Sequence, residues 1–420
     1  MPQGASMRIS VIIPTHNRAD TLKNTIDSIL PLRAEAYFEL IVVDNNSSDH
    51  TENLVKSYGD DLKYVFEKST SFTKARDAGA SNALYEILLY LDDDVLVRPG
   101  SFSKIVDVFT RHIDCGVIAG HIDPKFIQDP PAWALNCQVN FNGWSLYNKE
   151  TYSFIKREFQ RVPSAAGPIM AIRKDVYYLV GGFPPDTIGV ETNKGPKLFS
   201  KLYIGPGDFG LCTMVRKRGY SIYYDSNIAV FHVIPPIRLT VKFWRSRLIG
   251  EGYCRAICNR CFFNFSSLKL NVFRVLYESH FYNLYVSIRS RLSEQTSGST
   301  PEATYTEEVY LLFYKAYLDM DFVLRSNPDL AGFLWELGKK GVSDVEFDSV
   351  MSHLPKEYRY LVSDDVVYDT TPLDTVVALD AYLTKRRVSS EYKSPISYRV
   401  LFKIFQTLRG VKRKLKGLIL

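Results

Sequence analysis

The 420-residue sequence lacks several features that would assign it to a special class of protein. It has no run of about 18 uncharged apolar residues, so no membrane-spanning helix is predicted. Its first residues, MPQGASMRIS, contain no charged start, long apolar stretch or cleavage site, which argues against secretion. Six cysteines in a chain of this length do not make a disulfide framework, and free thiols are expected. Together these absences predict a cytoplasmic protein.

The composition is that of an ordinary globular chain, with 46% apolar and 23% charged residues and room for two domains. The net charge of +6 is modest, but the segment 397–420 carries basic residues and no acidic ones. Apolar residues in this segment recur at helical spacing. A basic amphipathic helix of this kind is typical of contact with an anionic membrane surface. The alternative is a helix docked on its own domain.

Short apolar runs rich in β-branched residues alternate with helical patterns in the first hundred residues. Strands are predicted over 9–13, 40–43, 62–66 and 87–91, and helices over 20–30, 51–58 and 72–83. This alternation predicts a parallel sheet covered by helices. Asp20 and either Ser48 or Asp49 are predicted as helix N-caps. Further on, strands are predicted over 117–120, 169–172 and 228–232, and helices over 307–324, 330–339 and 373–387.

Acidic side chains follow two of these predicted strands. Asp44 comes after the strand 40–43, where it could accept a hydrogen bond from a base or ribose or could simply form a turn. Asp92, Asp93 and Asp94 follow the strand 87–91 directly. Their mutual repulsion would be relieved by a divalent cation, and hard oxygen ligands suit Mg²⁺ or Mn²⁺. The alternative is a solvated acidic turn.

Two further residues stand at the ends of predicted elements. Asp208 opens an amphipathic helical pattern, where it is explained equally well as a helix cap. His232 ends the strand 228–232, and a single histidine there can be structural. Taken together with the acidic clusters and in this order along the chain, these residues indicate a functional site more strongly than each does alone.

That order resembles family 2 glycosyltransferases with the GT-A fold, over roughly residues 8–252. The resemblance lies in the segments SVIIPTHNRADTLKNTIDSIL, IVVDNNSSD, KARDAGASNA, LDDDV, AIRKDVYYLVGGF, the GD helix followed by RGY, and AVFH. It implies an α/β fold with a mostly parallel central sheet over 1–262. Beyond that range, the residue pattern predicts a helical connector over 263–292, a polar linker over 293–304 and a helical C-terminal domain over 305–420.

The resemblance also implies a role for each matched residue. Asp208 would be the catalytic base, and Asp94 and His232 would hold the divalent metal, Mn²⁺ or Mg²⁺. The nucleotide would contact Pro14, Thr15, Asn17, Arg18, Asp44, Arg76, Asp92 and Asp93. Ala166 and Gly167 would accommodate the donor sugar. One departure is Gly207, which stands where the family usually carries a glutamate.

The implied reaction is inverting transfer of a sugar from a nucleoside diphosphate, with UDP favoured, to a hydroxyl of a saccharide or lipid-linked saccharide. Such a reaction fits assembly of cell-surface polysaccharide or glycan, with no nucleic-acid partner. The alternatives are a sugar nucleotidyltransferase, which would need a Gly-rich basic loop after the first strand, and a non-catalytic carbohydrate-binding relative. A stacking role on the acceptor is predicted for Trp133 and Trp144, which could equally be core residues. The cysteines 254, 258 and 261 share one helix face, which favours packing.

Overall fold

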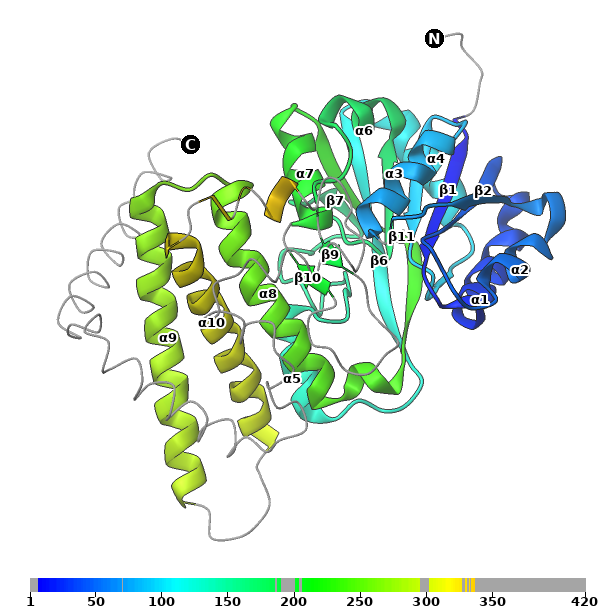
Figure 1. The fold of residues 1–420 in the computed structure, drawn as a ribbon. Helices are drawn as coiled ribbons and strands as arrows, with labels where there is room; N and C mark the ends of the chain where they lie inside the picture. The colour runs from blue at the N-terminus through cyan, green and yellow to red at the C-terminus, as the bar shows by residue number, and fades with distance from the viewer. Residues whose placement is uncertain are drawn as a thin grey trace.

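The computed structural model describes residues 7–69, 71–185, 187–189, 201–203, 206–294 and 302–326, together with 329, 330, 332 and 334–336. In Figure 1 a sheet with its covering helices lies beside a layer of long helices. The predicted helix over 373–387 and the basic segment 397–420 lie outside the described residues, as do most of the linker 293–304 and part of the helix 330–339.

The central sheet has nine strands, in the order β3-β2-β1-β4-β8-β6-β11-β5, with β7 also paired to β11. Their bounds are β1 Ile9–Thr15, β2 Phe38–Asp44, β3 Lys63–Phe66, β4 Ile87–Leu91, β5 Val95–Val97, β6 Cys115–Phe126, β7 Phe159–Arg161, β8 Ile169–Arg173 and β11 Ser221–Ile234. A separate antiparallel pair joins β9 Thr187–Gly189 to β10 Lys201–Tyr203. Strands β1 and β4 are buried along their whole length, which explains their continuous runs of apolar residues.

Seven helices accompany the sheet within the part of the chain that the structure describes. They are α1 Ala19–Ile29, α2 Thr51–Lys56, α3 Phe72–Asn82, α4 Ser101–Arg111, α5 Ala132–Phe141, α6 Lys174–Val180 and α7 Gly207–Lys217. Short 3-10 turns are η1 Leu30–Ala34, η2 Gly59–Asp61 and η3 Pro236–Leu239. Helix α4 shows why these segments are helical, because Phe102, Ile105 and Phe109 recur at spacings of three and four and are all buried.

The α/β fold class is confirmed, but the sheet is mixed rather than mostly parallel. Strand β1 is parallel to β2 and β4, and β2 to β3, as the alternating pattern predicts. Strand β6 is parallel to β11, whereas β8 runs antiparallel to both β4 and β6. Strands β5 and β7 are antiparallel to β11. The difference arises because β8 enters the sheet between β4 and β6, and no local pattern in the sequence encodes that insertion.

The insertion of antiparallel strands brings distant residues to one edge of the sheet. The carboxyl ends of β1 and β2 meet there, with Thr15 opposite Asp44. The start of β8 lies at the same edge, since Ile169 pairs with Leu91 at the end of β4. The loop before β8 and the residues after β4 are therefore neighbours.

The predicted strands and helices of the first hundred residues are confirmed, with small shifts at their ends. The predicted N-cap at Asp20 is wrong, because the capping position of α1 is Arg18 and Asp20 lies in the first turn. Asp49 instead serves two helix starts, accepting hydrogen bonds from the backbone N–H of Ala19 at 3.1 Å and of Thr51 at 3.0 Å. One carboxylate thus joins the first turns of α1 and α2.

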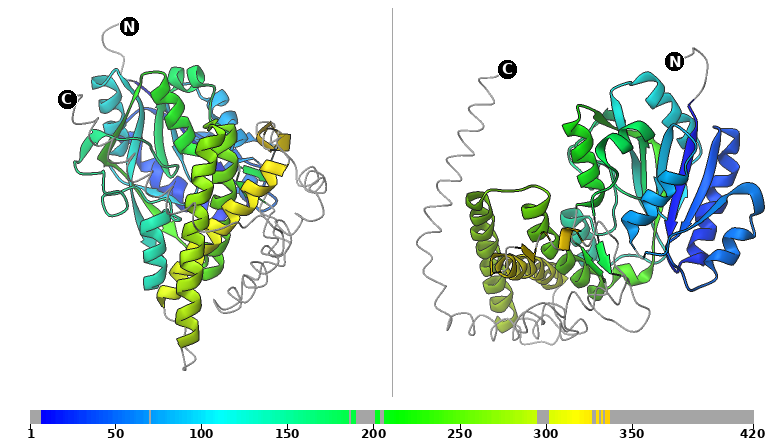
Figure 2. Two further views of the ribbon diagram at one scale, coloured as in Figure 1. Left: turned by 90° about the vertical axis from the view of Figure 1, so that its left-hand side faces the viewer. Right: turned by 45° about the horizontal axis from the view of Figure 1, so that its top comes forward.

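The helical layer consists of α8 Val241–Cys261, α9 Ser267–Glu294 and α10 Glu302–Ser326 (Figures 1 and 2). These helices share an apolar cluster of their own, and α10 also packs on α5. A fully buried ion pair, Arg245 with Glu308 at 2.8 Å, joins α8 to α10. Helix α8, assigned to the first domain from sequence, therefore packs mainly against α10 beyond the linker, and the proposed division into domains stays a prediction. No helix in the described ranges combines the length and apolar character needed to cross a bilayer.

The close approach of α3 to the sheet gives a test of the fold. A Cβ added at Gly79 would lie 2.3 Å from Ile12 Cγ2 and 3.3 Å from Val43 Cγ2. We expect Gly79→Ala to lower the free energy of unfolding by about 1–3 kcal/mol, because overpacking outweighs the better helix propensity of alanine. Urea denaturation measures this, with Ser81→Ala on the exposed side of α3 as the control. Equal stability of the two variants would contradict the tight contact.

Candidate active site

Three consecutive aspartates follow β4, and each has different partners. Asp93 is buried and accepts hydrogen bonds from Thr15 Oγ1 at 2.8 Å and from Arg18 Nη1 at 2.6 Å. Asp94 is also buried and lies 3.1 Å from Arg18 Nη2. Asp92 is the most accessible of the three, with a side chain 25% exposed. The prediction of a solvated acidic turn is therefore wrong for Asp93 and Asp94.

His232 faces Asp94 across the junction of β11 and β5. The two strands pair so that the backbone N–H of Val233 donates to the carbonyl of Asp94 at 2.9 Å. His232 Nδ1 lies 2.7 Å from the carbonyl oxygen of Trp144, which can only accept, so we assign the ring proton to Nδ1. Nε2, which then carries the lone pair, lies 3.1 Å from Asp94 Oδ1. A histidine held through one nitrogen by a backbone carbonyl is typical of a metal ligand.

The ligand atoms around this histidine fit a divalent cation. Atoms of Asp92, Asp94 and His232 all lie within 4.8 Å of one another, the only such group in the described ranges. No described residue donates a hydrogen bond to the buried Asp94 Oδ1. Two ligands at about 2.1 Å from a metal and at right angles to each other would be about 3.0 Å apart, close to the Oδ1–Nε2 distance. These residues can therefore hold Mg²⁺ or Mn²⁺, and Asp92 joins the predicted pair as a third candidate.

Asp94 is ionised in this setting. Burial alone would raise the pKa of Asp94, but the positive charges of Arg238 and Arg18 beside it outweigh burial and hold that pKa well below its usual range. Asp92 behaves differently, because burial and the negative charge of Asp94 raise its pKa to about 6. Of Asp92 and Asp94, the more exposed residue, Asp92, therefore has the higher pKa.

Arg76 of α3 connects this group to Asp208. Its Nη1 lies 2.6 Å from Asp208 Oδ1 and its Nη2 3.9 Å from Asp92 Oδ1. The guanidinium is buried between the rings of Phe72 and Phe183, at 4.0 and 4.4 Å from their centroids. Pro206 takes the N-cap position of α7, and Asp208 lies in the first turn, where its charge can still interact favourably with the helix dipole.

Gly167 lies where Arg76 and Asp208 meet. A Cβ at this position would be 2.7 Å from Asp208 Oδ2 and 2.9 Å from Arg76 Nη2. Because Gly167 has no side chain, Arg76 and Asp208 can pair directly beside the backbone of the loop before β8. Ala166 beside it is partly buried and packs against the main core.

The loops after β1 and β2 form the remaining wall of the site. Asn17, at a φ of 53°, accepts hydrogen bonds through Oδ1 from the backbone of Ser48 at 2.6 Å. Asp44 is buried and accepts from the backbone of Ser47 and from Tyr64 Oη, both at 2.8 Å. Asp44 therefore does form a turn, and contact with a base would use a second lone pair of its carboxylate. Pro14 lies within β1, opposite Val43.

The two tryptophans predicted to stack on an acceptor are buried instead. Trp144 is fully buried, packs against Trp244 with ring centroids 5.4 Å apart, and donates from Nε1 to the carbonyl of Arg238 at 3.0 Å. Trp133 is 7% exposed and packs against Tyr305 of α10. Neither ring presents a face to a sugar, so the packing alternative holds.

The cysteines are likewise packing residues. All six lie in the described residues and none forms a disulfide. Cys254 and Cys258 are buried on α8 with their sulfurs 3.6 Å apart. This arrangement agrees with the interpretation of one apolar helix face.

One site residue was missed by sequence analysis. Arg238 of η3 places Nη2 3.0 Å from Asp94 Oδ2 and Nη1 3.0 Å from His232 Nε2. It follows His232 by six positions through a Pro-Pro turn, and nothing in that spacing predicts a return to the site. Only the tertiary structure identifies it.

Residues 10–180 match the family model described as Glycosyl transferase family 2. These residues form a family 2 glycosyltransferase domain. The match includes the three aspartates after β4, Arg76 and Gly167, and it ends before Asp208 and His232.

Similar sequences also carry glycosyltransferase names. This chain is 40% identical over 117 residues to validoxylamine A glucosyltransferase of Streptomyces hygroscopicus subsp. jinggangensis, covering 27% of this chain and 28% of that protein. It is 31% identical over 105 residues to an uncharacterized glycosyltransferase of Rickettsia typhi, covering 24% of this chain and 32% of that one. The chain thus spans about a third or less of the length of these relatives.

Solved structures align over longer stretches at low identity. A mannosyltransferase from Pyrobaculum calidifontis in complex with GDP-Man and Mn²⁺ aligns over 85% of this chain and 84% of its own, with 17% identity and a TM-score of 0.40. GalNAc-T7 with UDP, GalNAc and Mn²⁺ aligns over 60% and 50%, with 18% identity and a TM-score of 0.39. Both identities are too low to transfer a ligand or a residue role to the glycosyltransferase domain.

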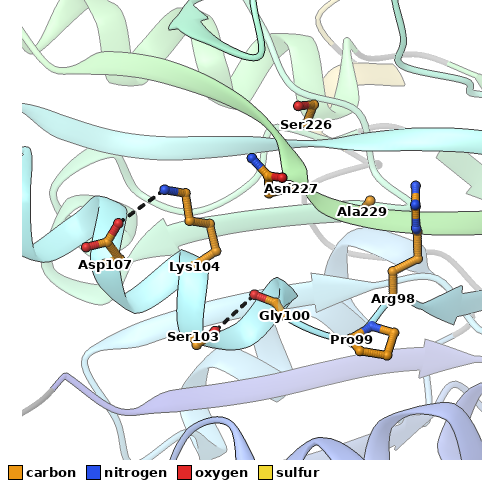
Figure 3. Close-up of a pocket in the computed structure, with 9 residues that line it drawn as sticks. All are labelled: Arg98, Pro99, Gly100, Ser103, Lys104, Asp107, Ser226, Asn227 and Ala229. Carbon is orange, nitrogen blue, oxygen red and sulfur yellow. Dashed lines mark hydrogen bonds and ion pairs between the residues drawn. The ribbon is translucent and has the colours of Figure 1, made fainter.

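A separate cavity of about 480 Å³ lies beside α4 (Figure 3). Its lining includes Arg98 from the loop before α4, Lys104 and Asp107 from α4, and Asn227 from the irregular part of β11. Lys104 is already paired with Asp107 at 3.2 Å and with Asp225 at 3.6 Å. None of the predicted site residues lines this cavity, so it is no part of the candidate active site.

The raised pKa of Asp92 generates a prediction for the metal-free glycosyltransferase domain. The folded protein binds this proton more tightly than the unfolded chain, so ionisation of Asp92 destabilises the fold as pH rises from about 4 through about 6. We expect Asp92→Asn to be more stable than the natural chain at pH 7, by no more than about 3 kcal/mol. This difference should vanish near pH 4.

Urea denaturation in EDTA across this pH range measures the difference. Asp175→Asn, at an exposed position in the first turn of α6, is the matched control and should show no such pH dependence. A lower stability of Asp92→Asn at pH 7 would mean that Arg76 stabilises ionised Asp92 more than burial and Asp94 destabilise it.

Proposed function

We propose that this protein is an inverting glycosyltransferase, which moves a sugar from a nucleoside diphosphate to an acceptor hydroxyl. One observation carries the proposal. Arg76 bridges the carboxylate of Asp208 to Asp92 of the metal-fitting group, so a candidate base and a candidate cation site face the same position at one sheet edge. A reaction with an anionic leaving group and an attacking hydroxyl needs both.

Asp94 and His232 would hold the metal, with Asp92 as a third ligand. When bound, the metal would stabilise the negative charge that develops on the departing diphosphate. Arg18 and Arg76 flank these ligands with guanidinium groups that can bind phosphate oxygens in pairs. This positive wall supports placing the diphosphate between the two arginines.

Asp208 would take the proton from the acceptor hydroxyl as that oxygen attacks the anomeric carbon. Its side chain is 24% exposed, which leaves it open to an acceptor. Arg76 pairs with it at 2.6 Å, and transfer of Arg76 to the diphosphate would leave the carboxylate available as a base. A single displacement of this kind inverts the anomeric centre.

The loops after β1 and β2 would hold the nucleoside, with Thr15, Asn17 and Asp44 on the base and ribose side. UDP is the proposed nucleotide, from the resemblance to the family. The donor sugar would lie over Ala166 and Gly167. A side chain at Gly167 would collide with the Arg76–Asp208 pair, which lies next to this loop. Manganese and magnesium are both compatible with the oxygen and nitrogen ligands.

The proposed acceptor is a saccharide or a lipid-linked saccharide in cell-surface glycan assembly. This part rests on the resemblance and on the basic segment 397–420, whose pattern predicts contact with the inner face of a membrane. The proposed location is the cytoplasm, at that membrane face.

The deciding experiment is a screen of nucleotide sugars with the purified full chain and Mn²⁺, which scores release of nucleoside diphosphate. We expect release with one or a few donors and its loss in EDTA. Pyrophosphate release from a nucleoside triphosphate and a sugar phosphate would favour a nucleotidyltransferase. Donor binding without turnover toward any acceptor or water would favour a non-catalytic relative.

The role of Asp208 gives a sharper prediction. Asp208→Asn preserves a hydrogen-bond acceptor for Arg76 but removes the proton acceptor, so kcat should fall by about 10² to 10⁴. Donor affinity, measured by calorimetry, should change little. Asp175→Asn, in the first turn of α6, is the matched control for a lost helix-terminal charge and should keep full activity. A comparable loss of donor binding in Asp208→Asn would place Asp208 in the nucleotide pocket instead.

A further inference from the structure

Arg238 lies on the atoms that a metal ion would use. Its guanidinium contacts Asp94 Oδ2 and His232 Nε2, each at 3.0 Å, and so spans two of the three candidate ligands. We infer that Arg238 is a stand-in cation, which lies across two of the metal-ligand side chains and must be displaced when a divalent ion binds. The inference rests on the proposed metal-dependent function.

The single lone pair of His232 Nε2 makes the two occupants mutually exclusive. Nδ1 is committed to the carbonyl of Trp144, so Nε2 is the only ring nitrogen that can accept a donor or bind a metal. It accepts from Arg238 Nη1 in this structure. A metal bound to His232 therefore requires that the guanidinium leave.

Trp144 fixes the backbone on both sides of this contact. Its carbonyl accepts from His232 Nδ1, and its indole Nε1 donates to the carbonyl of Arg238 at 3.0 Å. The backbone of Arg238 is therefore tied to a buried ring. Its side chain is 22% exposed, in contrast to 2% for Asp94, so the side chain can swing toward solvent without moving η3.

Displacement of Arg238 would couple metal binding to donor binding. A freed guanidinium beside the metal position has a diphosphate as its natural acceptor, because arginine binds phosphate oxygens through two parallel hydrogen bonds. The metal should therefore bind weakly to the protein alone and more tightly once a diphosphate is present. By linkage, the diphosphate gains the same factor from the metal.

The test measures Mn²⁺ binding by electron paramagnetic resonance of the free ion, with and without UDP and with no turnover. We compare the natural chain with Arg238→Met and with Arg18→Met. Arg18 also contacts Asp94 Oδ2, at 3.1 Å, but has no contact with His232 among its ion pairs and hydrogen bonds in the described residues, so its loss controls for net charge alone. Arg161→Met, which breaks a distant pair with Asp114, is the control for general effects.

Without UDP, we expect Arg238→Met to bind Mn²⁺ roughly tenfold or more tightly than the natural chain, the order set by one charged hydrogen-bonding group. Arg18→Met should gain clearly less, and Arg161→Met nothing. The factor by which UDP tightens Mn²⁺ binding should shrink in Arg238→Met. Thermal unfolding in EDTA with circular dichroism checks that each variant folds.

Other outcomes would overturn the inference in distinguishable ways. Equal Mn²⁺ affinity in Arg238→Met and the natural chain would show that Arg238 does not compete with the metal, while leaving the proposed metal site intact. Equal gains in Arg238→Met and Arg18→Met would reduce the effect to net charge. Absence of Mn²⁺ binding in every variant, with and without UDP, would overturn the proposed metal-dependent function itself.

Discussion

The arrangement of the site depends on compensating four carboxylates gathered at one edge of a buried sheet. Asp92, Asp93, Asp94 and Asp208 are matched by the three guanidinium groups of Arg18, Arg76 and Arg238. Uncompensated charges at this depth would destabilise the fold strongly. The arginines compensate these charges, and they are also the groups that a diphosphate would recruit. Stability of the fold and binding of the proposed donor therefore use the same residues.

The topology explains how these groups come together. Strand β4 delivers the aspartates, the insertion of β8 beside it brings Gly167, and β11 returns His232 to face Asp94. Each contribution comes from a strand of the central sheet or from residues directly beside one, which limits its movement. Ligand positions set by strand ends are more rigid than positions on free loops.

Buried aromatic residues support the site from behind. Trp144 orients both His232 and the backbone of Arg238, and it packs in turn against Trp244 at the start of α8. Helix α8 of the helical layer is thus connected to His232 by the contact of Trp244 with Trp144. A residue that the sequence suggested as a sugar platform instead holds the histidine ring in one orientation.

The sequence by itself determined the alternating strands and helices of the first hundred residues and the acidic residues at the end of β4, because periodicity and strand ends are local features. Order along the chain, through the family resemblance, also selected Asp208 and His232. Only the tertiary structure decided that Arg76 joins Asp208 to Asp92, that Trp144 sets the tautomer of His232, and that Arg238 turns back onto Asp94. Those contacts join residues up to 144 positions apart, and Arg238 faces Asp94 only because β11 pairs with β5. Such pairing depends on the whole core, so no local pattern predicts it.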